Sequence, residues 1–154
     1  MLSKVRLGVG VLTLSAAGFV GIALHENYTD KAIIPVPGDV PTLGFGSTEG
    51  VRMGDRTTPA AALARALQDA SKYEGALKKC VRVPLHQHEY DAFVSLAYNI
   101  GPGAFCSSTL VRKLNAGDYA GACKEISRWV YANGKSLAGL INRRAKERAM
   151  CEGR

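Results

Sequence analysis

The sequence is short of aromatic and acidic residues, and it contains no C-x-x-C pair, internal repeat or low-complexity segment. Aromatic residues make up only 7% of the chain, and no stretch combines them with basic residues as a nucleic-acid-binding groove does. Hydrophobic residues, at 47%, are present in ordinary amount. With 154 residues the chain is long enough for one domain with a real core and too short for two large ones.

The shortage of acidic residues leaves a strong positive charge. There are 13 Asp and Glu against 20 Lys and Arg, which gives a formal net charge of +7. Such a charge favours an acidic partner, which is a nucleic acid, an anionic membrane or an anionic polymer such as a cell wall. Because no nucleic-acid motif is present, we expect the partner to be the cell wall or the membrane and not a nucleic acid.

The four cysteines, Cys80, Cys106, Cys123 and Cys151, allow two interpretations. They are either reduced thiols in the core or, if the chain is exported, two disulfides. Four cysteines permit three pairings, and the spacing does not choose among them.

An uncharged run from Leu7 to Leu24 follows Lys4 and Arg6 near the start of the chain. Its length is close to the lower limit for a membrane-spanning helix. The positive charge before it, with His25 and Glu26 after it, predicts an N-terminus on the inner side of the membrane. Glycine and alanine lower its hydrophobicity. We therefore expect a weak, uncleaved anchor that can later leave the bilayer.

Two other interpretations of this run stay open. One is a signal peptide cleaved near Ser15-Ala16-Ala17. The other is a buried core helix.

Beyond the run, Ile33–Val36 and Thr42–Phe45 predict two short strands joined by a turn at Pro37-Gly38-Asp39. Prolines at 35, 37 and 41 exclude a central strand, so we expect a small exposed hairpin or three-stranded sheet.

The remainder predicts helices. Thr58-Pro59 starts a long helix that runs to Lys79, with Thr as N-cap and Pro in the first turn. A further helix is expected at about 86–99, ended by Gly101-Pro102-Gly103, and a short one from Ser107 or Ser108 to Leu114. Asp118 is expected to cap a helix that reaches Val130, and the last helix is expected at 137–151. The expected fold is α+β, with a small β lobe at 25–57, a connecting helix at 58–79 and a helical lobe at 80–154.

Three polar residues near the hairpin suggest chemistry. Glu26 lies just after the apolar run, whose flank disfavours the charged form of a carboxyl group. Asp39 supplies a second carboxylate, and Thr42 is placed to orient a water molecule. Two acids near a tight hairpin are the minimum for cleaving a glycosidic bond. Each residue also has a simpler interpretation. Glu26 would be a solvated acid at a membrane surface, Asp39 an ordinary turn residue and Thr42 an ordinary strand residue.

These residues, with several downstream segments, carry a family resemblance. Glu26 followed by the stretch 39–46, DVPTLGFG, resembles the catalytic hairpin of phage-type lysozymes. Similar segments follow in order, namely Thr57-Thr58-Pro59, 91–101, 108–110, 114–118, Trp129 and 139–144. With the Gly/Ala-rich run at the start, the resemblance narrows to the signal-anchor-release endolysins of tailed phages.

The resemblance implies a lysozyme-like fold and a muramidase that cuts the β-1,4 bond between N-acetylmuramic acid and N-acetylglucosamine in peptidoglycan. It implies an inverting reaction with Glu26 as acid, no metal or organic cofactor, and an arginine, Arg143 or Arg144, paired with Glu26. The enzyme would be a monomer that is first held in the host inner membrane by residues 7–24. It would then be released to the periplasm, where it causes host lysis.

One departure from the family concerns the second carboxylate. The family usually places an Asp nine residues after the Glu, where this chain has Pro35. Asp39 comes later, three residues before Thr42. Either a remodelled hairpin brings Asp39 across the cleft, or the second-carboxylate role is weak or absent.

For the cysteines we favour Cys106–Cys123, which flank two short helices expected to fold back on each other, and Cys80–Cys151, which would clip the last helix to the long one. His86-Gln87-His88 is interpreted as a helix start, because no further histidine and no paired acids accompany it as zinc ligands. The rival function is a membrane-anchored wall-binding protein without activity, which would tolerate Glu26→Gln. A pore former is a weaker rival, because only one spanning segment exists.

Overall fold

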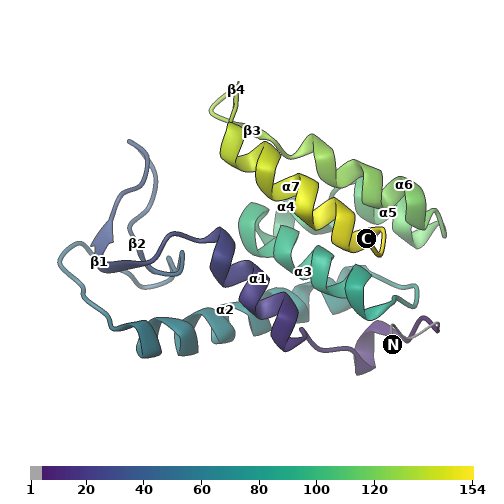
Figure 1. The fold of residues 1–154 in the computed structure, drawn as a ribbon, viewed down its shortest axis with the longest axis horizontal. Helices are drawn as coiled ribbons and strands as arrows, with labels where there is room; N and C mark the ends of the chain where they lie inside the picture. The colour runs from purple at the N-terminus through teal and green to yellow at the C-terminus, as the bar shows by residue number, and fades with distance from the viewer. Residues whose placement is uncertain (1–4) are drawn as a thin grey trace.

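The protein is represented by a computed structural model, in which residues 5–154 are described. A body of helices carries a small β lobe at one end (Figure 1). The lobe contains β1 (Thr29–Ile33) and β2 (Thr42–Gly44), and a second small hairpin contains β3 (Tyr131–Ala132) and β4 (Lys135–Ser136). The helices are α1 (Ala16–His25), α2 (Pro59–Cys80), α3 (Gln87–Ile100), α4 (Pro102–Cys106), α5 (Thr109–Asn115), α6 (Tyr119–Glu125) and α7 (Ala138–Cys151), with short 3₁₀ turns at Val9–Val11 and Ile126–Arg128.

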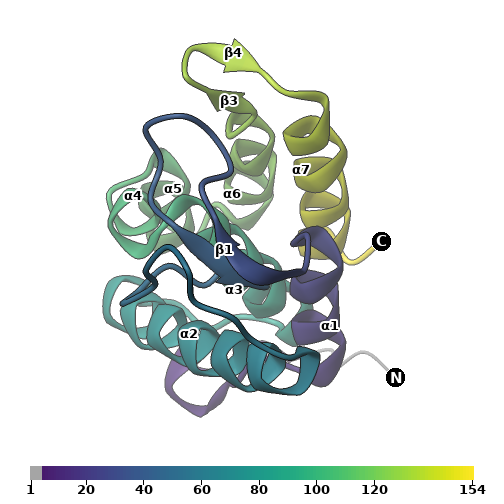
Figure 2. The ribbon, with the colours of Figure 1, turned by 90° about the vertical axis from the view of Figure 1, so that its left-hand side faces the viewer.

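Helix α3 is the centre of the fold. Every residue from Glu89 to Tyr98 is buried, because α1, α2, α4 and α7 all pack around this helix (Figures 1 and 2). Its apolar side chains form the main core with residues of the surrounding helices, including Ile22, Leu77 and Phe105. A helix that is buried on all sides gives the site a rigid floor.

The N-terminal segment differs from the expected anchor. A continuous helix over residues 7–24 is not observed, because the helix is confined to Ala16–His25. Among residues 5–154, no helix has both the length and the apolar content needed to cross a bilayer. Lys4 lies outside the described residues. The helix begins at Ser15, whose hydroxyl accepts a hydrogen bond from the Gly18 amide at 3.0 Å, as an N-cap does.

Buried carboxylates hold this segment against the helical body. The Leu14 amide donates to Glu74 at 2.6 Å, and the Ser15 hydroxyl donates to Asp91 at 2.5 Å. Arg6 donates twice to Glu89, at 2.8 and 3.1 Å. Glu89 and Asp91 are almost inaccessible to water, so removal of the segment would leave them short of partners at a considerable cost in free energy. Residues 5–25 are therefore an integral part of the folded body.

The β lobe is built differently from the predicted hairpin. Thr29 pairs with Gly44, and Ile33 pairs with Thr42. The first strand thus ends at Ile33, and the expected strand residues Ile34 and Val36 lie in the loop 34–41. The physical reason is that Pro35 and Pro37 have no amide hydrogen to donate to a ladder. Ala32, Leu43 and Val51 form the small core of this lobe.

The predicted helices are confirmed at α2, α3, α5 and α7, and so are the expected starts at Thr58 and, for α6, at Asp118. Of the two expected starts of α5, Ser108 is the N-cap. The helix expected to reach Val130 is wrong in length, because α6 ends at Glu125 and a 3₁₀ turn follows. Helix α4 was not predicted. Gly101, with φ of +89°, does end α3, but Pro102 then starts a new helix because its fixed φ suits the first turn.

The predicted disulfide pairing is wrong. The structure joins Cys80 to Cys106 and Cys123 to Cys151, in place of Cys106–Cys123 and Cys80–Cys151. Helix α4 packs on α2, which places the last residues of these two helices together, with their Cα atoms 5.6 Å apart. Helix α6 packs on α7, and Cys123 meets the last residue of α7 at the same separation.

Two glycines of α1 provide a test of how the segment packs. A Cβ added to Gly18 would lie 2.8 Å from the Asp91 carboxyl carbon, whereas a Cβ on Gly21 would meet nothing within 4 Å. We expect Gly18→Ala to lower the free energy of unfolding by about 1–3 kcal/mol through overpacking, and Gly21→Ala to leave it unchanged or to raise it slightly. Urea unfolding of the purified full-length variants measures both values. Equal stabilities would show that α1 does not pack against Asp91 as described.

Candidate active site

A cavity of about 520 Å³ lies between the β lobe and the helical body. All three predicted catalytic residues, Glu26, Asp39 and Thr42, line its wall. The other lining residues come from α1, the β lobe, α2 and α3, and they include Pro35, Gly46, Tyr73, Tyr98 and Asn99. The fold therefore brings the three predicted residues to one cavity.

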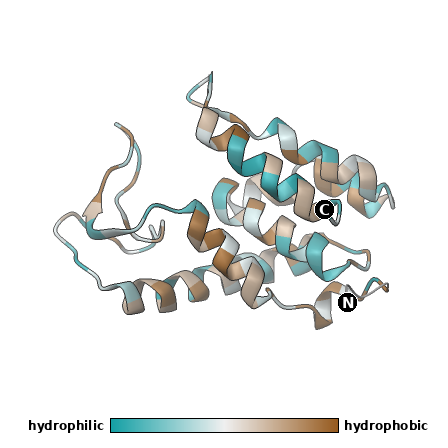
Figure 3. Cartoon of the chain, viewed as in Figure 1, coloured by the Kyte–Doolittle hydropathy of each residue, from teal (hydrophilic) through white to brown (hydrophobic). Residues whose placement is uncertain are grey.

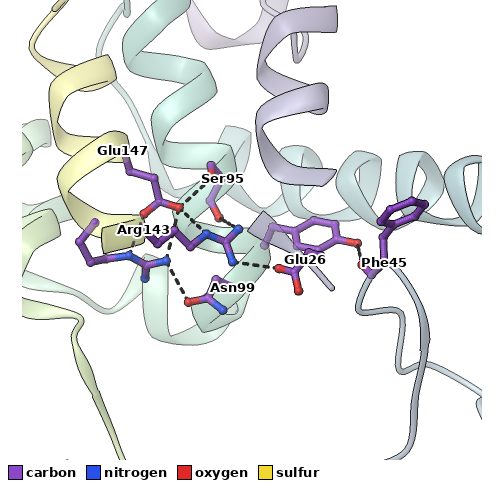
Figure 4. A network of polar contacts seen from close by, with 8 residues as sticks. Glu26, Phe45, Ser95, Asn99, Arg143 and Glu147 are labelled. Atoms are coloured by element: carbon purple, nitrogen blue, oxygen red, sulfur yellow. Dashed lines mark hydrogen bonds and ion pairs between the residues drawn. The ribbon is translucent and has the colours of Figure 1, made fainter. Parts of the chain in front are cut away.

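Glu26 occupies the C-terminal end of α1. Its amide donates to the Ile22 carbonyl at 3.3 Å as the C-cap of the helix, so the docking of α1 sets the position of this acid. The side chain is 20% exposed, and its carboxylate accepts a hydrogen bond from Arg143 Nη1 at 2.8 Å (Figure 4). Two helices that are far apart in sequence, α1 and α7, thus fix the carboxylate.

Arg143 belongs to a buried polar network on α3 and α7. Its Nε donates to Glu147 at 2.9 Å, and Glu147 also accepts from the Ser95 hydroxyl at 2.7 Å. Arg144 lies 2.8 Å from Glu147 and donates to Asn99 at 2.9 Å. Of the two arginines proposed to pair with the acid, Arg143 forms the ion pair with Glu26, while Arg144 pairs with Glu147.

The hairpin approaches Glu26 closely at Gly46. This residue has φ of +80°, and a Cβ there would lie 2.8 Å from Glu26 Oε2. The neighbouring Phe45 carbonyl accepts a hydrogen bond from the Tyr98 hydroxyl at 2.8 Å, which ties the hairpin to α3 (Figure 4). Glycine is required here by both its backbone conformation and the lack of space.

The histidine and the two tyrosines near Glu26 are neutral near pH 7. Burial, helped by the positive charges of Arg143, Lys146 and Arg144, lowers the pKa of His25 to about 4. Burial and nearby carboxylates raise the pKa of Tyr73 and of Tyr98 above the usual range. The field at Glu26 is therefore set by arginines and carboxylates rather than by histidine or tyrosine.

Asp39 and Thr42 stand on the β-lobe side of the cavity. Asp39 is exposed in the loop, and its carboxylate accepts the amide hydrogen of Val40 at 2.9 Å. Thr42 is half-buried on β2, and its hydroxyl donates to the Ile33 carbonyl at 3.4 Å. Pro35 lines the same wall at the position where the family usually has Asp. The roles of Asp39 and Thr42 remain predictions.

Four residues of this network are not indicated by the sequence alone, namely Ser95, Tyr98, Asn99 and Glu147. One signal was available for Glu147, because it stands four residues after Arg143 on a helix and this spacing favours an ion pair. The contacts of Ser95, Tyr98 and Asn99 join segments that are distant in sequence, so no local pattern points to these residues.

Comparison with known proteins identifies the family. The family model described as "Phage lysozyme" matches residues 23–147, which is most of the chain.

The chain belongs to the phage lysozyme family.

Relatives of this phage lysozyme support the assignment. It is 45% identical over 143 residues to an endolysin of Acyrthosiphon pisum secondary endosymbiont phage 1, covering 90% of this chain and 97% of the relative. It is 32% identical over 148 residues to the SAR-endolysin of Enterobacteria phage P21, covering 94% and 90%. The predicted family and the predicted function, peptidoglycan hydrolysis by a muramidase that lyses the host, are confirmed.

Solved structures show the same lysozyme-like fold. The muramidase domain of SpmX from Asticaccaulis excentricus matches with a TM-score of 0.83 at 33% identity, covering 90% of this chain and 97% of that domain. The P1 phage endolysin Lyz, at 24% identity or less, shows the fold in two forms. Its active form matches with a TM-score of 0.77 and covers 95% of this lysozyme and 88% of Lyz. Its secreted inactive form matches at 0.61, with 92% and 96% covered.

Two glycines of the β lobe test the contact with the acid. Gly46 and Gly50 both have positive φ, but only at Gly46 would a Cβ strike Glu26. If Glu26 acts in the reaction, we expect Gly46→Ala to reduce the rate of peptidoglycan cleavage by a factor on the order of ten to a hundred, because a misplacement of about 1 Å at a reacting group has a cost of that size. Gly50→Ala carries the same backbone strain and should stay near the wild-type rate. Turbidity loss of chloroform-treated bacterial cells measures both, and similar losses in the two variants would refute the close contact.

Proposed function

We propose that Glu26 is the general acid of this muramidase and protonates the glycosidic oxygen of the leaving sugar. The support is its place on the cavity wall, where it is largely shielded from water and held by Arg143 at 2.8 Å. When the proton moves to the oxygen, the bond to the anomeric carbon breaks, and the carboxylate formed on Glu26 is stabilised by the guanidinium.

A water molecule would attack the anomeric carbon from the opposite face of the sugar. Thr42 would orient this water, and Asp39 would accept its proton if the loop 34–41 closes on the substrate. Both residues line the cavity that holds Glu26. Attack by water from the face opposite the acid inverts the configuration at the anomeric carbon and needs no covalent intermediate or cofactor. The net charge of +7 favours the anionic wall that carries the substrate.

We further propose that residues 1–24, through the run 7–24, form a signal anchor in the host inner membrane and that the described fold is the released, periplasmic state of a monomer, with residues 25–154 as the lysozyme domain. One support is similarity to a protein named SAR-endolysin. Another is α1 itself, which stays apolar on its outer side, where Val20 is 54% and Leu24 80% exposed (Figure 3).

This proposal links the anchor to activity. Glu26 follows Leu24 by two residues, and it meets Arg143 only because α1 is docked on α3. A bilayer that holds α1 would keep the acid away from α7. The better fold match to the active than to the inactive form of P1 Lyz agrees with the docked state as the working one.

Replacement of the acid tests the proposed mechanism. We expect Glu26→Gln to lower the release of reducing sugar from purified peptidoglycan at least a thousandfold, because an amide cannot supply the proton. Glu49→Gln is the matched control, since Glu49 is an exposed carboxylate of the β lobe that pairs with Lys72. A fully active Glu26→Gln variant would refute the mechanism, and wall binding without sugar release by the wild type would favour the non-catalytic rival.

Anchoring can be tested without disturbing the docked fold. Gly8, Gly10 and Gly21 have no atoms within 4 Å of an added Cβ, whereas Gly18 does. We expect the triple change of these three glycines to Leu to keep the protein in the membrane fraction and to abolish wall cleavage there, since the added side chains favour the bilayer. The same protein extracted in detergent should regain activity. Efficient cleavage by the membrane-held form would exclude regulation by anchoring.

A further inference from the structure

Glu147 is a buried carboxylate that the proposed reaction does not use. Its side chain is 1% exposed. One of its oxygens accepts from Arg143 Nε at 2.9 Å and from the Ser95 hydroxyl at 2.7 Å, and the other lies 2.8 Å from Arg144 Nε. The guanidinium of Arg143 thus bridges Glu147 on one side and Glu26 on the other (Figure 4).

The charges of this cluster depend on the state of Glu26. With Glu26 ionised, two arginines face two carboxylates, and the cluster is neutral. With Glu26 protonated, as a general acid must be before the reaction, one positive charge remains. If Glu147 carried no charge, ionised Glu26 would face two cations, and the proton would be held much less readily.

We propose that Glu147 is a positioning residue whose charge offsets Arg143 and Arg144, so that Arg143 orients Glu26 without stripping it of its proton. The inference rests on the proposed role of Glu26. It assigns Glu147 a role in the pH range of activity, beyond the geometry of the ion pair.

Other groups near Glu26 do not replace this balance. They are His25 from α1, Asp39 from the loop, Asp69 and Tyr73 from α2, Tyr98 from α3, and Lys146 from α7. His25 is neutral above about pH 5 because its pKa is lowered to about 4, and both tyrosines are neutral because their pKa is raised. Asp39 is exposed, and water screens it. Asp69 accepts a hydrogen bond from the buried Ser47 at 2.6 Å and does not line the cavity that holds Glu26.

Glu147 itself is opposed by its environment. Burial raises the pKa of its carboxyl, while Arg144, Arg143 and Ser95 act in the opposite direction. Because Arg143 Nε, Arg144 Nη2 and the Ser95 hydroxyl all donate to the same oxygen of this carboxyl group, and Arg144 Nε lies 2.8 Å from the other, we assign the ionised form.

The test compares pH profiles of kcat/KM, whose alkaline limb reports loss of the proton from the free enzyme's acid. We expect Glu147→Gln to move the alkaline limb about one pH unit lower and to cut activity at neutral pH about tenfold, with little change at the acidic end. Arg144→Gln should move the limb in the opposite direction, and the double variant should return it toward the wild-type position. Glu125→Gln is the control, because Glu125 also bridges two cations, Lys113 and Arg128, and should not move the limb.

Several outcomes would overturn the inference. A loss of rate that is uniform across pH, with the limb unmoved in Glu147→Gln, would give Glu147 a structural role only. If Glu147→Gln does not fold, Arg144→Gln and the double variant decide, and a limb that stays in place in both refutes the charge balance. Glu26→Gln separates the two levels, because an active Glu26→Gln enzyme defeats the proposed acid itself. If Glu26→Gln is inactive but the alkaline limb does not move in the Glu147→Gln, Arg144→Gln and double variants, only the role of Glu147 is refuted.

Discussion

The site depends on one constraint, which is that the acid is the C-cap residue of a short helix whose other end is held by a buried carboxylate. Asp91 of α3 accepts both the amide and the hydroxyl of Ser15, and Gly18 lies against the same side chain. These contacts fix the axis and the rotation of α1, and therefore the position of Glu26 one turn beyond Ile22. A helix of ten residues is not stable alone, so its geometry comes from packing. The cavity wall that carries Glu26 is thus assembled by tertiary contacts of an apolar segment.

The buried charges of α7 complete that centre from the opposite side. Arg143 is 6% exposed, and Arg144 and Glu147 are each 1% exposed, so their charges are almost fully removed from water. Desolvation of such a cluster costs about as much as its ion pairs return, and it contributes little to stability on balance. The cluster instead orients the guanidinium of Arg143. Because Glu147 holds one edge of this group, only the other edge can face Glu26. The core of the helical body therefore sets the electrostatics of the cavity.

The β lobe contributes the opposite wall of the cavity but cannot hold that shape alone. A two-stranded sheet with a core of three buried residues is marginal in water. The hydrogen bond from Tyr98 to the Phe45 carbonyl and the close approach of Gly46 to Glu26 fasten it to the helices. The disulfides act elsewhere, where each joins the last residue of one helix to a packed neighbour. They stabilise the helical body and do not cross-link the loop 34–41.

The sequence by itself determined the features that depend on neighbours along the chain. Helix starts at Thr58, Ser108 and Asp118 follow from side chains that cap their own backbone, and the family follows from the order of motifs around Glu26. Only the tertiary structure decided the disulfide partners, the choice of Arg143 over Arg144, and the helical limits of the first segment. These depend on which helices pack together and on buried partners such as Asp91, which lies 76 residues from Ser15. Side chains that meet only through folding leave no periodic or local signal in the sequence.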